Sequence, residues 1–146
     1  MSPPTLYRPQ RPASALGLPY PETLIRAGLS GFPSPAQDYE GRQLDLNEHL
    51  IKRPSATFFM RVTGDSMEAF DMYADDLLII DRSLDPRPGH IVAALVDGEL
   101  IVKRYEILDT RHCLTSGNPR YAPIPLDSCD CQVWGVIRAV IHEYPV

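Results

Sequence analysis

The prolines of this 146-residue chain are distributed very unevenly, and this constrains its fold more than any other sequence feature. Proline fixes φ and has no backbone N–H, so closely spaced prolines interrupt helices and sheets alike. Eight of the 15 prolines fall within the first 35 residues: Pro3, Pro4, Pro9, Pro12, Pro19, Pro21, Pro33 and Pro35. We therefore expect residues 1 to about 40 to form an extended arm, with weak helical or extended character only at 22–29. The folded body must come from the rest of the chain.

Beyond the arm, the pattern of apolar residues predicts a mostly β domain. A short helix is expected at 44–53, because Pro54 lies just beyond its end. Five later segments are rich in apolar, aromatic or β-branched residues and are predicted strands: 57–62, 77–80, 91–96, 100–105 and 132–141. Asp97-Gly98 separates two of them, and this turn pair is a strong hairpin signal because both central positions need φ > 0. A hydrophobic content of 44% is sufficient for one packed domain.

The net charge of −5 is also unevenly placed. Residues 1–30 carry three arginines and one glutamate, a charge of +2, which leaves −7 on residues 31–146. Affinity for nucleic acid depends largely on neutralising phosphates with lysine and arginine. An acidic body of this kind is therefore a poor candidate for binding nucleic acid by itself.

Other compositional features predict a cytoplasmic protein without a metal or cofactor. No segment approaches the roughly 20 apolar residues of a membrane span, and the N-terminus lacks a signal-peptide pattern. The three cysteines, Cys113, Cys129 and Cys131, are too few and odd in number for a disulfide framework. The Cys129-x-Cys131 pair could be half of a metal site, but no second pair or nearby histidine completes a tetrahedral set. We expect free thiols.

The tetrapeptide 64–67 (Gly-Asp-Ser-Met) contains a candidate nucleophile, Ser66, directly after a predicted strand. A tight turn here can raise a hydroxyl above the sheet and leave backbone N–H groups pointing at one spot, as in an oxyanion hole. The alternative is that Asp65 and Ser66 simply cap a short helix, as these residue types often do. The tetrapeptide alone favours the cap.

Lys103 changes that balance, because a neutral lysine can take the proton of a serine hydroxyl. A free lysine titrates near about 10.4, so keeping one neutral at pH 7 costs roughly 4.6 kcal/mol unless burial disfavours the ammonium. Lys103 ends the apolar run 100–102 on the second strand of the predicted hairpin, where burial is plausible. Strand alternation places only one of Lys103 and Arg104 inward, and the chemistry requires Lys103. The alternative is an ordinary solvated lysine.

At these positions the chain resembles the self-cleaving Ser/Lys proteins of the bacterial SOS response, the LexA/UmuD superfamily, and UmuD more closely than LexA. Segments 57–80 and 96–104 carry the dyad motifs, with Lys103 lying 37 positions after Ser66. Segment 30–36 (Ser-Gly-Phe-Pro-Ser-Pro-Ala) is similar to the UmuD cleavage segment. Residues 45–47 and 54–57 also match, so that the resemblance covers about residues 29–141.

The resemblance implies a single compact β-rich protease domain of the LexA/UmuD C-terminal type, with a Pro-rich extended N-terminal arm. Residues 1–30 would be removed by self-cleavage at the Ser30–Gly31 bond. The product would consist of an arm remainder, 31–43, and a body, 44–146. Ser66 would be the nucleophile and Lys103 the general base, and the backbone N–H groups of Ser66 and Met67 would hold the oxyanion.

The resemblance also implies partners for such a self-cleaving serine endopeptidase. A RecA filament on single-stranded DNA would stimulate cleavage, and the product would act as a homodimer with a UmuC-like subunit of an error-prone translesion polymerase. No helix-turn-helix precedes residue 30, which argues against a LexA-type repressor and against direct sequence-specific DNA binding. A signal peptidase shares the dyad but works at a membrane. The remaining alternative is a catalytically silent dimeric accessory subunit of a translesion polymerase.

The chain departs from the family pattern at two places. Ser30 replaces the usual cysteine or alanine before the scissile bond, a small polar change that should still fit a small-residue pocket. Segment 74–76 (Ala-Asp-Asp) lacks the glycine of the family's Asp-Gly-Asp turn. We expect Asp75 and Asp76 to lie in a solvated turn, and the four histidines to be scattered surface or helix-cap residues.

Overall fold

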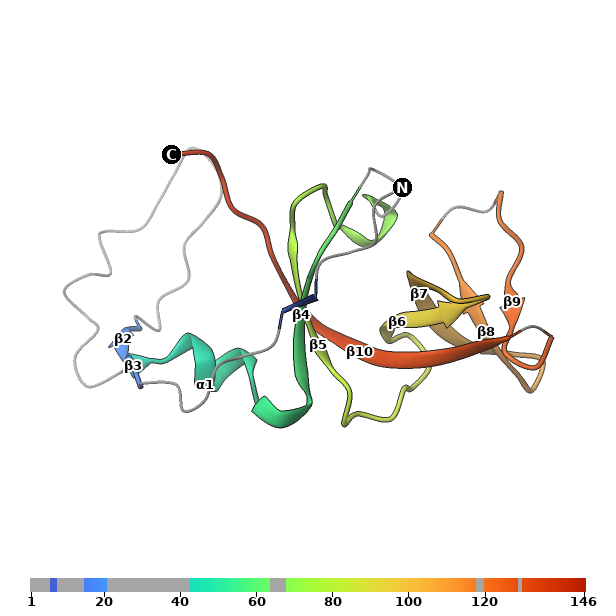
Figure 1. Ribbon diagram of the computed structural model, residues 1–146, viewed down its shortest axis with the longest axis horizontal. Coiled ribbons are helices and arrows are strands. Elements are labelled where there is room, and N and C mark those ends of the chain that lie inside the picture. The colour runs from blue at the N-terminus through green and yellow to red at the C-terminus, as the bar shows by residue number, and fades with distance from the viewer. Residues whose placement is uncertain (1–5, 8–14, 21–42, 64–67, 118–119, 129) are drawn as a thin grey trace, which may run out of the picture. The chain divides into compact units, whose positions relative to one another are not determined.

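The structure is a computed structural model that describes residues 6–7, 15–20, 43–63, 68–117, 120–128 and 130–146 (Figure 1). The expectations for segment 22–29, for the Ser30–Gly31 bond and for the tetrapeptide 64–67 lie outside these residues. The chain divides into two compact units, one of Met1–Gln10 with Arg53–Val146 and one of Arg11–Lys52.

The larger unit is built on one antiparallel sheet, which confirms the predicted mostly β fold. Its eight strands lie in the order β1-β4-β5-β10-β6-β7-β8-β9. They are β1 (Leu6–Tyr7), β4 (Thr57–Arg61), β5 (Leu77–Asp81), β6 (Ile91–Val96), β7 (Glu99–Leu108), β8 (Arg111–Thr115), β9 (Ile124–Pro125) and β10 (Cys131–Ile141). Two short 3-10 helices lie before and after β4, η2 (Pro54–Ala56) and η3 (Glu68–Phe70).

Strand β10 joins the two halves of this sheet and is the long curved ribbon in Figure 1. Its first part pairs with β6 and its second part with β5, and the register shifts once in each pairing. Gly135 lies where the strand changes partner. A Cβ there would lie 2.6 Å from Ile80 Cγ2, so only glycine allows this close approach.

Both faces of the sheet are packed. One cluster of buried side chains comprises Met60, Val62, Met72, Leu78, Ile80 and Ala93. The second comprises Val92, Ala94, Tyr105, Leu114 and Val136. Because side chains alternate along a strand, neighbouring residues of β6, such as Val92 and Ala93, belong to different clusters. The apolar runs that predicted β5 and β6 are therefore continuous rather than alternating.

The predicted elements agree with the structure in position and differ in extent. All five predicted strands are present, although β7 continues three residues beyond the expected end. Helix α1 spans only Leu46–Leu50, because Asp45 is its N-cap and accepts hydrogen bonds from the amides of Asn47 and Glu48 at 2.9 and 3.4 Å. Lys52 Nζ donates to the carbonyl of Glu48 at 3.1 Å beyond the helix end.

The Pro-rich arm contains short strand pairings that the proline pattern did not predict. Leu6 and Tyr7 of β1 pair with Met60 and Phe59 of β4. In the smaller unit, β2 (Leu18–Pro19) pairs with β3 (Gln43–Leu44). Proline lacks only the donor of a ladder bond, so a two-residue strand at a sheet edge accommodates it.

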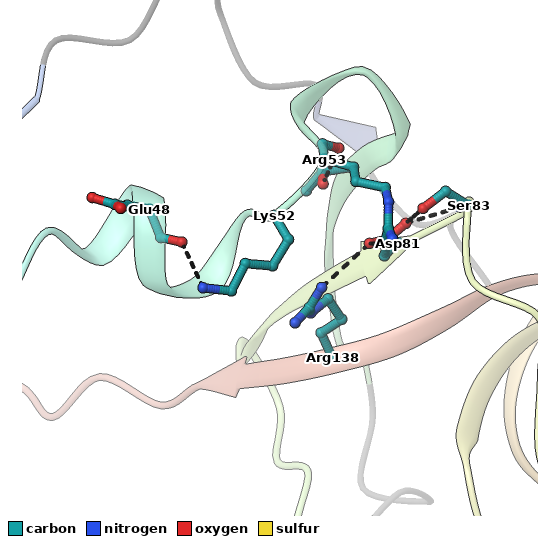
Figure 2. A network of polar contacts seen from close by, with 7 residues as sticks. Glu48, Lys52, Arg53, Asp81, Ser83 and Arg138 are labelled. Atoms are coloured by element: carbon teal, nitrogen blue, oxygen red, sulfur yellow. Dashed lines mark hydrogen bonds and ion pairs between the residues drawn. The ribbon is translucent and has the colours of Figure 1, made fainter.

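A buried carboxylate, Asp81, organises the end of β5, as Figure 2 shows. Ser83 donates to Asp81 Oδ1 from its amide at 2.8 Å and from its hydroxyl at 2.5 Å. The guanidinium groups of Arg138 and Arg53 lie 3.5 and 3.7 Å from Asp81 Oδ2. Burial acts to raise the pKa of Asp81, but the Ser83 hydrogen bonds and the two arginines outweigh it, so the pKa is lowered from its ordinary value of 3.8.

We predict that Asp81→Asn lowers the free energy of unfolding by about 2 kcal/mol at pH 7, because it removes a buried charge that two arginines and a serine satisfy. A carboxylate whose pKa is lowered by folding stabilises the fold above its unfolded value of 3.8, and that contribution is lost as the pH falls through the folded value. Urea unfolding at pH 7 and pH 3 should therefore show a difference between wild type and variant that shrinks in acid.

The exposed pair Arg111–Asp127 provides a matched control, with Arg111 Nη2 at 2.8 Å from Asp127 Oδ1. Exposed ion pairs contribute little, so Asp127→Asn should leave the unfolding transition nearly unchanged. Equal losses of stability in the two variants at pH 7 would contradict the role assigned to Asp81.

Candidate active site

The proposed base, Lys103, lies in the middle of β7. The Asp97-Gly98 turn, with φ values of 50° and 83°, joins β6 to β7 as predicted and sets their register. In that register Lys103 is paired with Val92, a residue of the second hydrophobic cluster. The Lys103 side chain is half-buried. Among the residues that the structure describes, no carboxylate forms an ion pair with its Nζ.

The contrast expected between an inward Lys103 and a solvated Arg104 is not seen, because both residues are half-buried. The sheet is packed on both faces, so alternation places the two residues beside different clusters. Arg104 is paired with Ile91, which packs against the first cluster, and its guanidinium lies 5.3 Å from the ring centroid of Phe70. Arg104 is thus a β7 residue that contacts η3.

The connection between β8 and β9 brings the residues after the tetrapeptide and Lys103 to one region of the molecule. A Cβ at Gly117 would lie 2.3 Å from Ala69 Cβ, so glycine is required for this connection to approach η3. Further along the same connection, the ring centroid of Tyr121 lies 5.8 Å from Lys103 Nζ. Gly117 therefore approaches the segment that begins two residues after Ser66, and Tyr121 approaches the proposed base.

On the N-terminal side of the tetrapeptide, Val62 is held by the turn before β5. Its amide donates to the carbonyl of Asp76, and the amide of Asp75 donates to the carbonyl of Val62, both at 2.9 Å. Asp75 has a φ of 69°, in the left-handed region that favours glycine. Asp75 thus takes the left-handed conformation at the position where the family pattern has glycine, because aspartate is among the residues that tolerate it.

Asp76 is buried, with 2% of its surface exposed, so the expectation of a solvated Asp75-Asp76 turn is wrong for this residue. Its Oδ2 accepts from the amide of Tyr73 at 2.9 Å, and its Oδ1 accepts from His142 Nδ1 at 2.5 Å. Burial acts to raise the pKa of Asp76, but the Tyr73 amide and His142 outweigh it and lower the pKa. The carboxylate therefore ties the segment after β10 to the turn that holds Val62.

Of the five residues expected in the site, Lys103 is the one that the structure describes. Lys103 occupies a strand of the predicted hairpin. Ser66 and Met67, and the cleavage segment with Ser30 and Gly31, lie outside the described residues. A lysine without a carboxylate partner in the described part of the chain is chemically suited to accept a proton, once its amine is neutral.

The sequence patterns did not identify Tyr121, Gly117 or the Asp76–His142 pair. Tyr121 lies in a proline-containing connection without strand or helix periodicity, so no local pattern distinguishes it. Asp76 and His142 are separated by 66 residues, and only the pairing of β5 with β10 brings them together. In the described part of the chain, no helix has the length and apolar character needed to cross a membrane.

Comparison with known proteins identifies the family. The family model described as Peptidase S24-like matches residues 23–138. Protein SamA of Salmonella typhimurium is 44% identical over 114 residues, covering 78% of this chain and 79% of SamA. Protein MucA of Escherichia coli is 43% identical over 120 residues, covering 80% and 81%. A LexA repressor of Shewanella piezotolerans is 36% identical over 112 residues, covering 77% of this chain and 52% of the repressor. The chain therefore belongs to the Peptidase S24-like family, as a UmuD-like member of the LexA/UmuD superfamily.

Proposed function

We propose that this protein is a self-cleaving serine endopeptidase that cuts its own Ser30–Gly31 bond with a Ser66/Lys103 dyad. The observation that carries the proposal is the family match, which spans residues 23–138 and so includes all four of these residues. The position of Lys103 on the second strand of the β6–β7 hairpin, without a carboxylate ion-pair partner among the described residues, supports its part as the base.

The reaction would proceed by acyl transfer. Neutral Lys103 accepts the hydroxyl proton of Ser66, and Ser66 Oγ attacks the carbonyl carbon of Ser30. Backbone N–H groups of Ser66 and Met67 stabilise the oxyanion of the tetrahedral intermediate. When the intermediate collapses, the bond to Gly31 breaks and the Lys103 ammonium protonates the leaving amine. Water then hydrolyses the ester between Ser66 and Ser30 and releases residues 1–30.

The biological role that follows is in SOS mutagenesis, in the cytoplasm of a bacterium. A RecA filament on single-stranded DNA would stimulate cleavage by binding the cleavable conformation more tightly, which shifts its population without supplying new chemistry. The product, residues 31–146, would form a homodimer and act with a UmuC-like subunit in an error-prone translesion DNA polymerase. Its acidic charge of −7 is consistent with leaving contacts to DNA phosphates to that partner.

Intact mass spectrometry of the purified chain tests this proposal directly. We expect a species beginning at Gly31 after incubation near pH 10, and the same species at pH 7 when RecA, an ATP analogue and single-stranded DNA are present. RecA and nucleotide without DNA provide the control, because no filament forms. A chain that stays at 146 residues under every condition would support the alternative, a catalytically silent accessory subunit of a translesion polymerase.

A further inference from the structure

The ring of Tyr121 lies over the amine of the proposed base. Its centroid is 5.8 Å from Lys103 Nζ, within the roughly 6 Å at which cation–π attraction operates. Tyr121 itself is 65% exposed, whereas Lys103 is half-buried. The exposed aromatic ring therefore lies close to the amine, and β7, which carries Lys103, contributes Tyr105 to the second hydrophobic cluster.

An aromatic face distinguishes between the two protonation states of an amine. The π system is negative at its face, so it attracts an ammonium and has no comparable attraction for a neutral amine. General base catalysis by lysine requires the neutral form. A ring in this position therefore favours the inactive form of the base.

The other groups near Lys103 do not account for such a preference. Val92, its cross-strand partner, is apolar. Tyr105 lies on the same face of β7 but its hydroxyl contacts His112 Nδ1. Arg104 lies on the opposite face against Phe70. Within the described part of the chain, Tyr121 is thus the group placed to stabilise the charged lysine.

We propose that Tyr121 restrains self-cleavage by favouring the ammonium form of Lys103, and that it is therefore a positioning residue that sets the pH range of the reaction. This inference rests on the proposed dyad. Gly117, in the same connection, approaches Ala69 of η3. The proposed restraint uses only residues of this chain and needs no additional partner.

The test compares Tyr121→Leu with Tyr121→Phe in the full chain, without RecA, by rates of self-cleavage between pH 7 and pH 10.5. Leucine keeps an apolar side chain over the amine but removes the ring, whereas phenylalanine keeps the ring. We expect Tyr121→Leu to cleave about 2- to 5-fold faster at pH values where the rate still rises, with the same plateau at high pH. Tyr121→Phe should follow wild type.

A second measurement separates this effect from altered folding. In a Ser66→Ala background, NMR titration of the Lys103 side chain should show a midpoint at lower pH in the Leu variant than in the Phe variant. If the wild type cleaves itself and Tyr121→Leu cleaves at the same rate or more slowly, the inference is overturned and the dyad stays intact. The same holds if Lys103 titrates at the same pH in the Leu and Phe variants. Absence of cleavage in the wild type under all of these conditions would overturn the dyad and the inference together.

Discussion

Ser66→Ala is expected to abolish self-cleavage, with no product beginning at Gly31 at pH 7 with a RecA filament or near pH 10 without one. The hydroxyl is the proposed nucleophile, and removing such a group lowers the rate of a serine protease by at least about 10³-fold. The change deletes one oxygen, so we expect the thermal unfolding midpoint to remain close to that of wild type. Mass spectrometry and circular dichroism on the same samples check both expectations.

Ser128→Ala is the matched control for this variant. Ser128 is exposed in the connection between β9 and β10, where its hydroxyl donates to the carbonyl of Pro125 at 2.9 Å. The same loss of a hydroxyl there should leave the cleavage rate unchanged. Persistent cleavage in Ser66→Ala at the wild-type rate would assign the reaction to another nucleophile or to a contaminating protease.

The rate of self-cleavage without RecA is expected to rise about tenfold for each pH unit, and so by about 10³ between pH 7 and pH 10, until the base is fully neutral. The reason is that only the neutral amine of Lys103 can accept the serine proton, and its fraction grows tenfold per unit below the titration midpoint. Rates from intact mass spectrometry at half-unit intervals measure this slope.

Lys103→Arg and Arg104→Lys provide the paired controls for the pH dependence. A guanidinium stays protonated throughout this range, so Lys103→Arg should remove cleavage at every pH. Arg104 contacts Phe70 rather than Tyr121, and a lysine in its place should preserve the slope. A flat pH profile in the wild type would exclude Lys103 as the base.

The strands and the hairpin were predictable because they depend on local order along the chain. The sequences of β5 and β6 are continuously apolar, because the sheet is packed on both faces there. Asp97-Gly98 has the positive φ values that its turn requires. Strands β8 and β9 were not predicted. β8 has only five residues and its burial does not alternate, because Arg111 and His112 are exposed whereas Cys113 and Leu114 are buried, and β9 contains a proline and has two residues. These two segments are strands because they pair with neighbouring strands of the sheet, β8 with β7 and β9 with β8.

In the candidate site, too, some residues were predictable from the sequence and others were not. Ser66 and Lys103 were singled out from residue types, because the proposed chemistry requires those side chains, and the cleavage segment was singled out by its resemblance to that of UmuD; these assignments stay predictions. Tyr121 was not singled out, since its contact with Lys103 joins two segments that are 18 positions apart in the chain and no local pattern marks it. The half-burial of both Lys103 and Arg104 was also missed, because the alternation rule assumes one solvated face and this sheet has none at β7.

The sequence by itself therefore determined the mostly β body and the β6–β7 hairpin, and it indicated the residues proposed for chemistry. These follow from φ restriction, apolar periodicity and side-chain reactivity, which are properties of short segments. Tertiary structure alone decided the order of the sheet, the contact of Asp76 with His142 and the aromatic environment of Lys103. Each of these depends on contacts between residues that are far apart in the chain. Such contacts form only when the chain is folded, so no local sequence pattern encodes their interaction energy.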